Sequence, residues 1–137
     1  MQLQIALVCD YAEQTSDGKL DIKGVFNDLV APGFPAKHDM FLVLRMEWGR
    51  DDRGEYEFQV DLVDPSMRST MTISGHSDVD LRGLESPPAR TQIIMPLEDV
   101  IFPTTGEYKF HIQVKGRTYE GPSLFLMEAD ITEETSE

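Results

Sequence analysis

The chain has 137 residues, of which 40% are hydrophobic and 27% are charged. This length suits a single domain with its own core, and the composition is that of a globular protein rather than a disordered one. Twelve Lys and Arg against 25 Asp and Glu give a formal net charge of −13. That charge repels phosphate backbones and anionic lipid surfaces, which argues against nucleic acid and membranes as partners, and solubility is its simplest explanation.

Cysteine usage and the N-terminal residues bear on location. Cys9 is the only cysteine, so no intramolecular disulfide can form, and a reducing compartment is the natural setting. The first ten residues have no basic segment, and their apolar run is too short for a signal peptide or a membrane span. We therefore expect a cytoplasmic protein.

Short apolar runs with an alternating pattern predict strands in the first half of the chain. Leu3–Cys9 has apolar residues on both faces, and Lys19–Phe26 reads as its hairpin partner, with a β-bulge near Gly24. Met40–Trp48 is the most hydrophobic run and predicts a central strand. Glu55–Leu62 alternates strictly and predicts a half-buried strand after a charged loop.

The pattern is weaker in the next part of the chain. Arg68–Ser74 predicts a strand, and Gly75–Pro88 predicts a brief edge strand followed by a loop. Arg90–Met95 predicts a further strand. Two prolines in Pro96–Pro103 oppose a long strand there, because proline cannot donate to the hydrogen-bond ladder.

The clearest strand is Thr105–Val114, where four apolar residues alternate with four polar ones. A register slip of one residue would send all four apolar side chains into water, so this strand should fix its neighbours. Arg117–Met127 returns beside it after a tight turn. Its two faces are Leu124 with Leu126, and Phe125 with Met127.

Eight or nine such strands, with turn signals between them and no crossover helices, predict an all-β antiparallel two-sheet sandwich over residues 1–130. Residues 131–137 read as an acidic flexible tail. Gly106-Glu107-Tyr108 resembles the tyrosine corner of immunoglobulin-like domains, in which a tyrosine hydroxyl bonds back to the preceding loop. We therefore expect an immunoglobulin-like or C2-like sandwich without the disulfide.

A resemblance covers nearly the whole chain. From Leu7–Asp10 through Gly18–Phe26 and Phe34-Pro35 to Gly106–Tyr108, the sequence resembles an uncharacterised bacterial family of domains of unknown function. The resemblance implies a bacterial setting. It implies no activity, cofactor or site residue.

One apolar segment opposes both helix and central strand, because it contains two prolines and a glycine. It predicts a loop that either caps the core, which is the simpler interpretation, or presents an interface to another protein. The candidate interface residues are Leu29, Val30, Pro32, Phe34 and Pro35.

Acidic loops are the alternative candidate site, because calcium takes carboxylate and carbonyl oxygens. No Gly-punctuated calcium loop is present, so solvated turns are the simpler interpretation. The weak metal candidates are Asp51, Asp52, Asp61 and Asp64, with Asp78 and Asp80 as a further acidic pair.

No catalytic constellation stands out. Cys9 would need a base beside it to act as a nucleophile, and His38, His76 and His111 share no spacing with it or with a zinc site. A buried structural thiol is the simpler interpretation of Cys9. We therefore predict a non-enzymatic domain without a cofactor, acting through an unknown protein partner or as a homo-oligomer, with calcium or small-ligand binding as the alternative.

Overall fold

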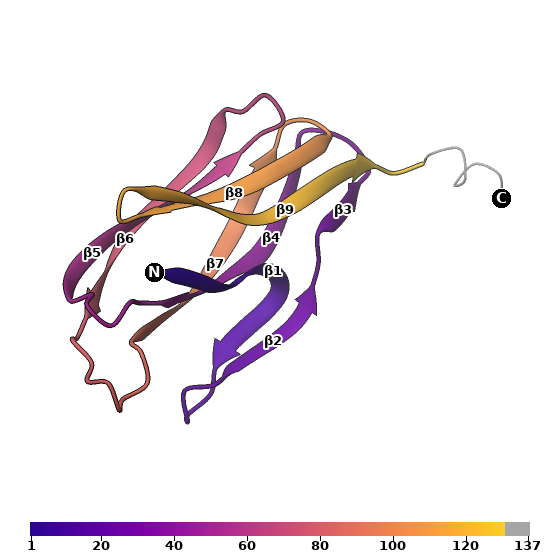
Figure 1. Cartoon of the computed structure of the whole chain (residues 1–137). Coiled ribbons are helices and arrows are strands. Elements are labelled where there is room, and N and C mark those ends of the chain that lie inside the picture. The colour runs from indigo at the N-terminus through magenta and orange to yellow at the C-terminus, as the bar shows by residue number, and fades with distance from the viewer. Residues whose placement is uncertain (131–137) are drawn as a thin grey trace.

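The structure is a computed structural model that describes residues 1–130, so the predicted acidic tail lies outside the described residues. Two sheets pack face to face and confirm the predicted all-β sandwich (Figure 1). Sheet A has the strand order β2-β1-β4-β7, and sheet B has the order β3-β9-β8-β5-β6. The strands are β1 (Gln2–Gln14), β2 (Leu20–Val25), β3 (Asp28–Ala31), β4 (Ala36–Glu47), β5 (Gly54–Val63), β6 (Ser69–Val79), β7 (Arg90–Phe102), β8 (Gly106–Val114) and β9 (Arg117–Glu128). In this part of the chain no helix is long and apolar enough to cross a membrane.

The main core lies between the sheets and follows the alternation of the sequence. The even-numbered residues of β4 point inward together with the apolar residues of β5, β8 and β9. Fully or nearly fully buried examples are Met40, Leu42, Leu44, Met46, Val60, Leu62, Phe110, Ile112, Leu124 and Leu126. The predicted pairing of β8 with β9 is confirmed, because the two strands run antiparallel from Gly106↔Leu126 to Val114↔Arg117.

Tyr108 makes the hydrogen bonds expected of a tyrosine corner. Its hydroxyl donates to the Thr104 carbonyl oxygen at 2.8 Å and accepts from the Thr104 backbone N–H at 3.1 Å. The side chain is completely buried, and its ring lies edge-on to Phe102 with centroids 5.0 Å apart. The Tyr108 hydroxyl thus forms hydrogen bonds with both the N–H and the carbonyl oxygen of Thr104, in the turn before β8.

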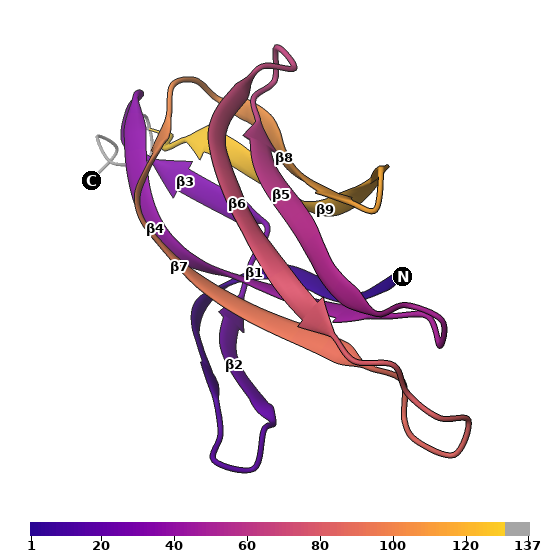
Figure 2. The same cartoon turned by 90° about the vertical axis from the view of Figure 1, so that its left-hand side faces the viewer.

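The β1–β2 hairpin bends toward the outer face of sheet A (Figure 2). Its tip reaches β7, the edge strand at the other end of sheet A, where the Gln92 side chain donates a hydrogen bond to the Gly18 carbonyl oxygen at 3.3 Å. A second, smaller hydrophobic cluster fills the space beneath it, with Cys9, Ala12 and Val43 buried at its centre. Sheet A is therefore covered on both faces, as the two apolar faces of Leu3–Cys9 indicate.

Two strands are longer than the sequence predicts. β7 continues through Pro96, because it is an edge strand whose free side needs no hydrogen-bond donor, and it bulges where the Asp99 backbone has a φ of 52°. β6 continues through Gly75, where the Phe58 ring of β5 lies so close that a Cβ atom on Gly75 would be 2.5 Å from Phe58 Cζ. The cross-strand aromatic ring takes the place of the missing side chain.

The prediction of a loop over Leu29–Pro35 is partly wrong. Asp28–Ala31 forms strand β3, which pairs with β9 in parallel, from Asp28↔Phe125 to Ala31↔Glu128. The other strand pairs are antiparallel, as predicted. The loop proper begins after Ala31 and contains a cis peptide bond between Phe34 and Pro35.

Candidate protein-contact surface and other candidate sites

The predicted interface residues divide between core and solvent. Leu29 and Phe34 pack against the main core, which confirms that this segment caps the sandwich. Val30 is 64% exposed, and Pro32 and Pro35 are exposed as well. Because residues alternate along a strand, β3 sends Leu29 inward and Val30 outward.

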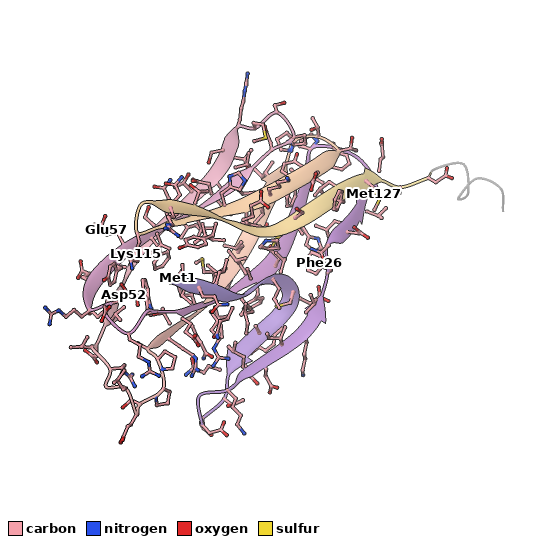
Figure 3. All side chains as sticks on the ribbon, viewed as in Figure 1. Met1, Phe26, Asp52, Glu57, Lys115 and Met127 are labelled. Atoms are coloured by element: carbon pink, nitrogen blue, oxygen red, sulfur yellow. The ribbon has the colours of Figure 1, made fainter. Side chains whose placement is uncertain are left out.

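The outward residue of β3 meets two exposed apolar residues of β9. Val30 is paired with Met127 in the β3–β9 ladder, and Phe125 lies two residues before Met127 on the same face. Phe125 and Met127 are each 43% exposed. We call Val30, Phe125 and Met127 the apolar margin, because they lie at the β3 edge of sheet B. Figure 3 shows Met127 at the opposite end of the molecule from Asp52 and Lys115.

Carboxylates flank the apolar margin. Phe125 is paired with Asp28 of β3 on one side and with Glu107 of β8 on the other, so the three form one row across the sheet. Asp28 is exposed and Glu107 is half-buried. An apolar centre with a charged rim is the arrangement of many protein-contact sites, and here Asp28 and Glu107 form an acidic rim on either side of Phe125, with Lys109 of β8 one outward position beyond Glu107.

Hydrogen bonds hold this edge in place. The Asn27 side-chain amide donates to the Ser123 carbonyl oxygen at 2.8 Å, and the Phe125 N–H donates to the Asn27 carbonyl oxygen at 2.7 Å. At the other end, the Ala129 N–H donates to the Ala31 carbonyl oxygen at 2.8 Å. The short strand β3 is therefore fixed at both ends, and the apolar margin is a preformed surface.

Sequence reasoning found Val30 but missed Phe125 and Met127. The signal was the second apolar face of Arg117–Met127, which an ordinary half-buried strand does not have. The parallel β3–β9 pairing, which brings Val30 to Met127, joins distant segments and leaves no mark in the local sequence.

The four acidic metal candidates lie apart or are already bound to protein groups. Asp51 is exposed, and Asp64 accepts hydrogen bonds from the backbone N–H groups of Ser66 and Arg68 in its turn. Asp61 accepts hydrogen bonds from the Gln59 side-chain amide and from the hydroxyl groups of Ser69 and Thr72. Within residues 1–130, no three His, Cys, Asp or Glu side chains come together as a metal ion would need. Calcium binding stays a prediction that this arrangement does not favour.

Asp52 is the most constrained carboxylate. It accepts hydrogen bonds from the Gly49 N–H at 2.8 Å, the Tyr56 hydroxyl at 3.2 Å and the Lys115 ammonium at 2.5 Å. Burial alone would raise the pKa of Asp52, but these bonds and the positive charge of Lys115 outweigh it and hold that pKa below its ordinary value. The same contact raises the pKa of Lys115. With Trp48 stacked on Tyr56 at 4.8 Å, the cluster locks together the loops at one end of the sandwich.

Cys9 and the three histidines lie at separate places. Burial raises the pKa of the Cys9 thiol, whose Sγ donates to the Tyr11 carbonyl oxygen at 3.4 Å. His38, on β4, lies edge-on to the Phe26 ring. His76, on β6, is paired with Glu57 of β5, and His111 is on β8. Cys9 therefore has the environment of a structural thiol rather than of an activated nucleophile.

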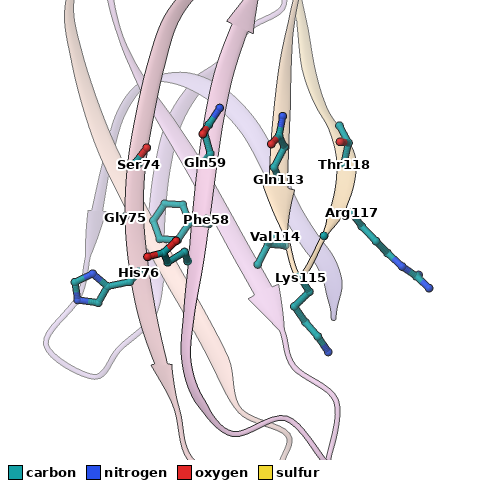
Figure 4. A pocket seen from close by; sticks show the side chains of 12 residues that line it. Phe58, Gln59, Ser74, Gly75, His76, Gln113, Val114, Lys115, Arg117 and Thr118 are labelled. Atoms are coloured by element: carbon teal, nitrogen blue, oxygen red, sulfur yellow. The ribbon is translucent and has the colours of Figure 1, made fainter.

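A polar hollow of about 590 Å³ lies on the outer face of sheet B, where the β8–β9 turn diverges from β5 (Figure 4). A row of hydrogen-bonding side chains crosses it from strand to strand. The row is Ser74, Gln59, Gln113 and Thr118, each opposite the next in the ladder. The hollow is open and carries both charge signs, with Glu57 and His76 on one side and Lys115 and Arg117 on the other.

Comparison with known proteins supplies a family but no activity. No curated protein matches the sequence. A family model described as a family of unknown function, DUF6941, matches residues 4–125. This range runs from the first strand to the residue paired with Asp28 in β9, so it covers both sheets of the sandwich. The chain belongs to the family of unknown function DUF6941.

Proposed function

We propose that this domain is non-catalytic and works by contact with another protein through the apolar margin. The observation that carries the proposal is the exposure of Val30, Phe125 and Met127 side by side on a fixed sheet edge. Burying such side chains in an interface removes apolar surface from water, which stabilises association by about 25 cal/mol per Å² before the losses of entropy on binding.

The acidic rim indicates the chemistry of the partner. Asp28 and Glu107 flank Phe125 in the same row, so a matching surface has an apolar centre and Lys or Arg at its edge. A reducing setting fits the single buried thiol Cys9, and we propose a cytoplasmic location on that ground.

Site-specific photo-crosslinking in the native host tests this proposal. A photoreactive phenylalanine analogue at position 125 is expected to give one discrete adduct, whose partner is identified by mass spectrometry and then titrated as a purified protein. The same analogue at Leu84, which is 88% exposed in a distant loop, is the control and should not give that adduct.

A second substitution decides whether the margin itself makes the contact. Val30→Asp is expected to abolish the adduct at position 125, because it places a carboxylate in the apolar centre, in addition to the two in the rim. Since Val30 is exposed, the substitution should change the free energy of unfolding by no more than about 0.5 kcal/mol. A lost adduct would then reflect lost contact rather than unfolding. No adduct at position 125, or the same adduct at positions 125 and 84, would refute the proposal.

A further inference from the structure

Within residues 1–130, four strands lie at the edges of the two sheets, and three of them carry features that prevent pairing with another strand. β3 has only four residues. β2 has six, with Lys23 and the left-handed Gly24 near its end. β7 is interrupted by Pro96 and by the bulge at Asp99. Short length, lysine, proline and bulges are the devices by which proteins prevent edge-to-edge pairing.

The fourth edge, β6, has none of these devices from Met71 to Val79, because its bulge, at Thr70, lies at the beginning of the strand. β6 is 11 residues long, contains no proline or lysine, and pairs with β5 without a register shift from Val79↔Gly54 to Met71↔Leu62. Figure 2 shows it as the outermost strand of sheet B. Within residues 1–130, no backbone hydrogen bond joins β6 to any strand but β5. Every second residue of β6 therefore points its N–H and C=O groups into solvent.

We propose that the free edge of β6 pairs with the β6 edge of a second copy of this chain, antiparallel and across a two-fold axis. The two five-stranded sheets B then form one continuous sheet. The proposal does not rest on the apolar margin, because β3 and β6 are the opposite edges of sheet B.

The side chains of β6 are self-complementary when the axis passes through Ser74. On the outer face, Thr72 lies opposite His76 of the second copy, so the imidazole N–H can donate to the oxygen of the Thr72 hydroxyl, which itself donates to Asp61. On the inner face, Ile73 lies opposite Gly75, whose inner side the Phe58 ring of the same copy covers, and Met71 lies opposite Ser77, whose hydroxyl is hydrogen-bonded to the Thr91 hydroxyl of β7 at 2.7 Å.

Two further observations favour a second copy. Met71 and Ile73 pack against the core but remain partly exposed at the edge, and a neighbouring strand would cover them. Asp78 is the only carboxylate of β6 and lies near one end, so antiparallel pairing keeps the two Asp78 side chains at opposite ends of the interface. Strand pairing thus avoids bringing like charges together although each copy carries a net charge of −13.

Sedimentation equilibrium on the full chain, with three variants, tests the proposal. The wild-type chain is expected to dimerise. Ser74→Lys places two lysines together at the axis and should weaken the dimer by about tenfold or more. Gln113→Lys adds the same charge to the same polar row two strands away and should leave dimerisation within about twofold of wild type. Val30→Asp should also leave it intact.

Crosslinking tests the register. Residues opposite each other in antiparallel strands have Cα atoms about 4.5–5.5 Å apart, which suits a disulfide. Ser74→Cys should therefore form a covalent dimer under mild oxidation, whereas Gln113→Cys should not, and the buried Cys9 does not compete.

The outcomes distinguish the two proposals. A wild-type chain that is monomeric at all accessible concentrations overturns β6 pairing and leaves the apolar margin untouched. A dimer weakened equally by Ser74→Lys and Gln113→Lys, or equal crosslinking of Ser74→Cys and Gln113→Cys, also overturns it. A dimer dissolved by Val30→Asp overturns it as well and assigns self-association to the apolar margin.

Discussion

A single hydroxyl group decides the geometry of the turn before β8. The Tyr108 hydroxyl is bonded to both the N–H and the carbonyl oxygen of Thr104, and the side chain is completely buried. Removing it leaves those two backbone groups, which meet the hydroxyl at the partly buried end of the Tyr108 ring, without their partner. An unsatisfied buried polar group costs more than a hydrogen bond contributes when it forms.

Tyr108→Phe is therefore expected to lower the free energy of unfolding by about 1–3 kcal/mol, measured by urea denaturation. Tyr11→Phe is the matched control. The Tyr11 hydroxyl also makes a hydrogen bond, to Glu13 at 3.3 Å, but the residue is 45% exposed. Its loss should change stability by less than about 0.5 kcal/mol, and equal effects of the two substitutions would contradict the role assigned to the corner.

Asp52 makes stability depend on pH at the other end of the molecule. Its folded-state pKa lies below the ordinary value, so as pH falls the unfolded chain takes up the proton first and unfolding is favoured. The stabilisation is complete above the unfolded-state pKa of about 3.9 and is lost as pH falls through the lower, folded-state pKa.

The expected result is that wild type is more stable than Asp52→Asn at neutral pH, and that this difference shrinks as pH is lowered below about 4. Urea denaturation at several pH values measures it. Asp51→Asn removes the same charge from the exposed neighbour outside the cluster and is the control. A difference between wild type and Asp52→Asn that is the same at every pH would show that the lowered pKa does not contribute.

At the scale of elements, the sequence was informative wherever a strand's own alternation matched its burial. The alternation of Thr105–Val114 predicts the strand that the structure shows as β8, because its inward residues all face one core. The predictions failed where the position of a strand in the sheet, or a neighbouring strand, allowed a residue that usually disfavours strands. Pro96 is tolerated because β7 is an edge strand, and Gly75 because Phe58 covers it. The partners of a strand are set by tertiary structure, so local patterns do not reveal them.

The same reason explains what was predicted of the candidate contact surface. Val30 was predicted because an apolar segment with prolines is visible in the sequence alone. Phe125 and Met127 became part of the surface only through the parallel pairing of β9 with β3.

The β1–β2 hairpin is expected to open as a unit and to control access to Cys9. Ile22 lies in the small cluster beneath the hairpin, so Ile22→Ser should loosen the hairpin and speed the labelling of Cys9 by a thiol reagent under native conditions. Each 1.4 kcal/mol of lost hairpin stability should accelerate labelling about tenfold.

Ile73→Ser is the control for that experiment. Ile73 is also half-buried, but it packs against the main core on sheet B. Ile73→Ser should lower the free energy of global unfolding but accelerate Cys9 labelling less than Ile22→Ser does. If both variants accelerate labelling in proportion to their global stability, Cys9 is reached only by complete unfolding and the hairpin is not a separate unit.

At the scale of the whole molecule, the net charge of −13 acts in opposite directions on the two proposed contacts. Two copies of the chain repel each other, whereas a partner with a basic rim is attracted. Salt screens both effects, because the Debye length falls from about 30 Å at 0.01 M to about 8 Å at 0.15 M.

Raising the salt concentration over that range is therefore expected to strengthen self-association through β6 and to weaken binding of a partner at the apolar margin. Sedimentation equilibrium measures the first effect, and titration calorimetry with the partner found by crosslinking measures the second. Self-association that weakens with salt would mean that opposite charges, rather than strand edges, join the two copies.

The pairing of β3 with β9 also determines when, during synthesis of the chain, the apolar margin can form. The hydrogen bond from Asn27 to Ser123 joins residues 96 positions apart, and within residues 1–130 β9 is the last strand in chain order. Contacts over such long separations form late, because the intervening chain must first be ordered. On the ribosome, strands β1, β2 and β4 to β8 can pair while translation continues, but β3 cannot pair until β9 has emerged. The apolar margin thus exists only on a chain translated through β9, so a chain terminated before β9 does not display it to a partner.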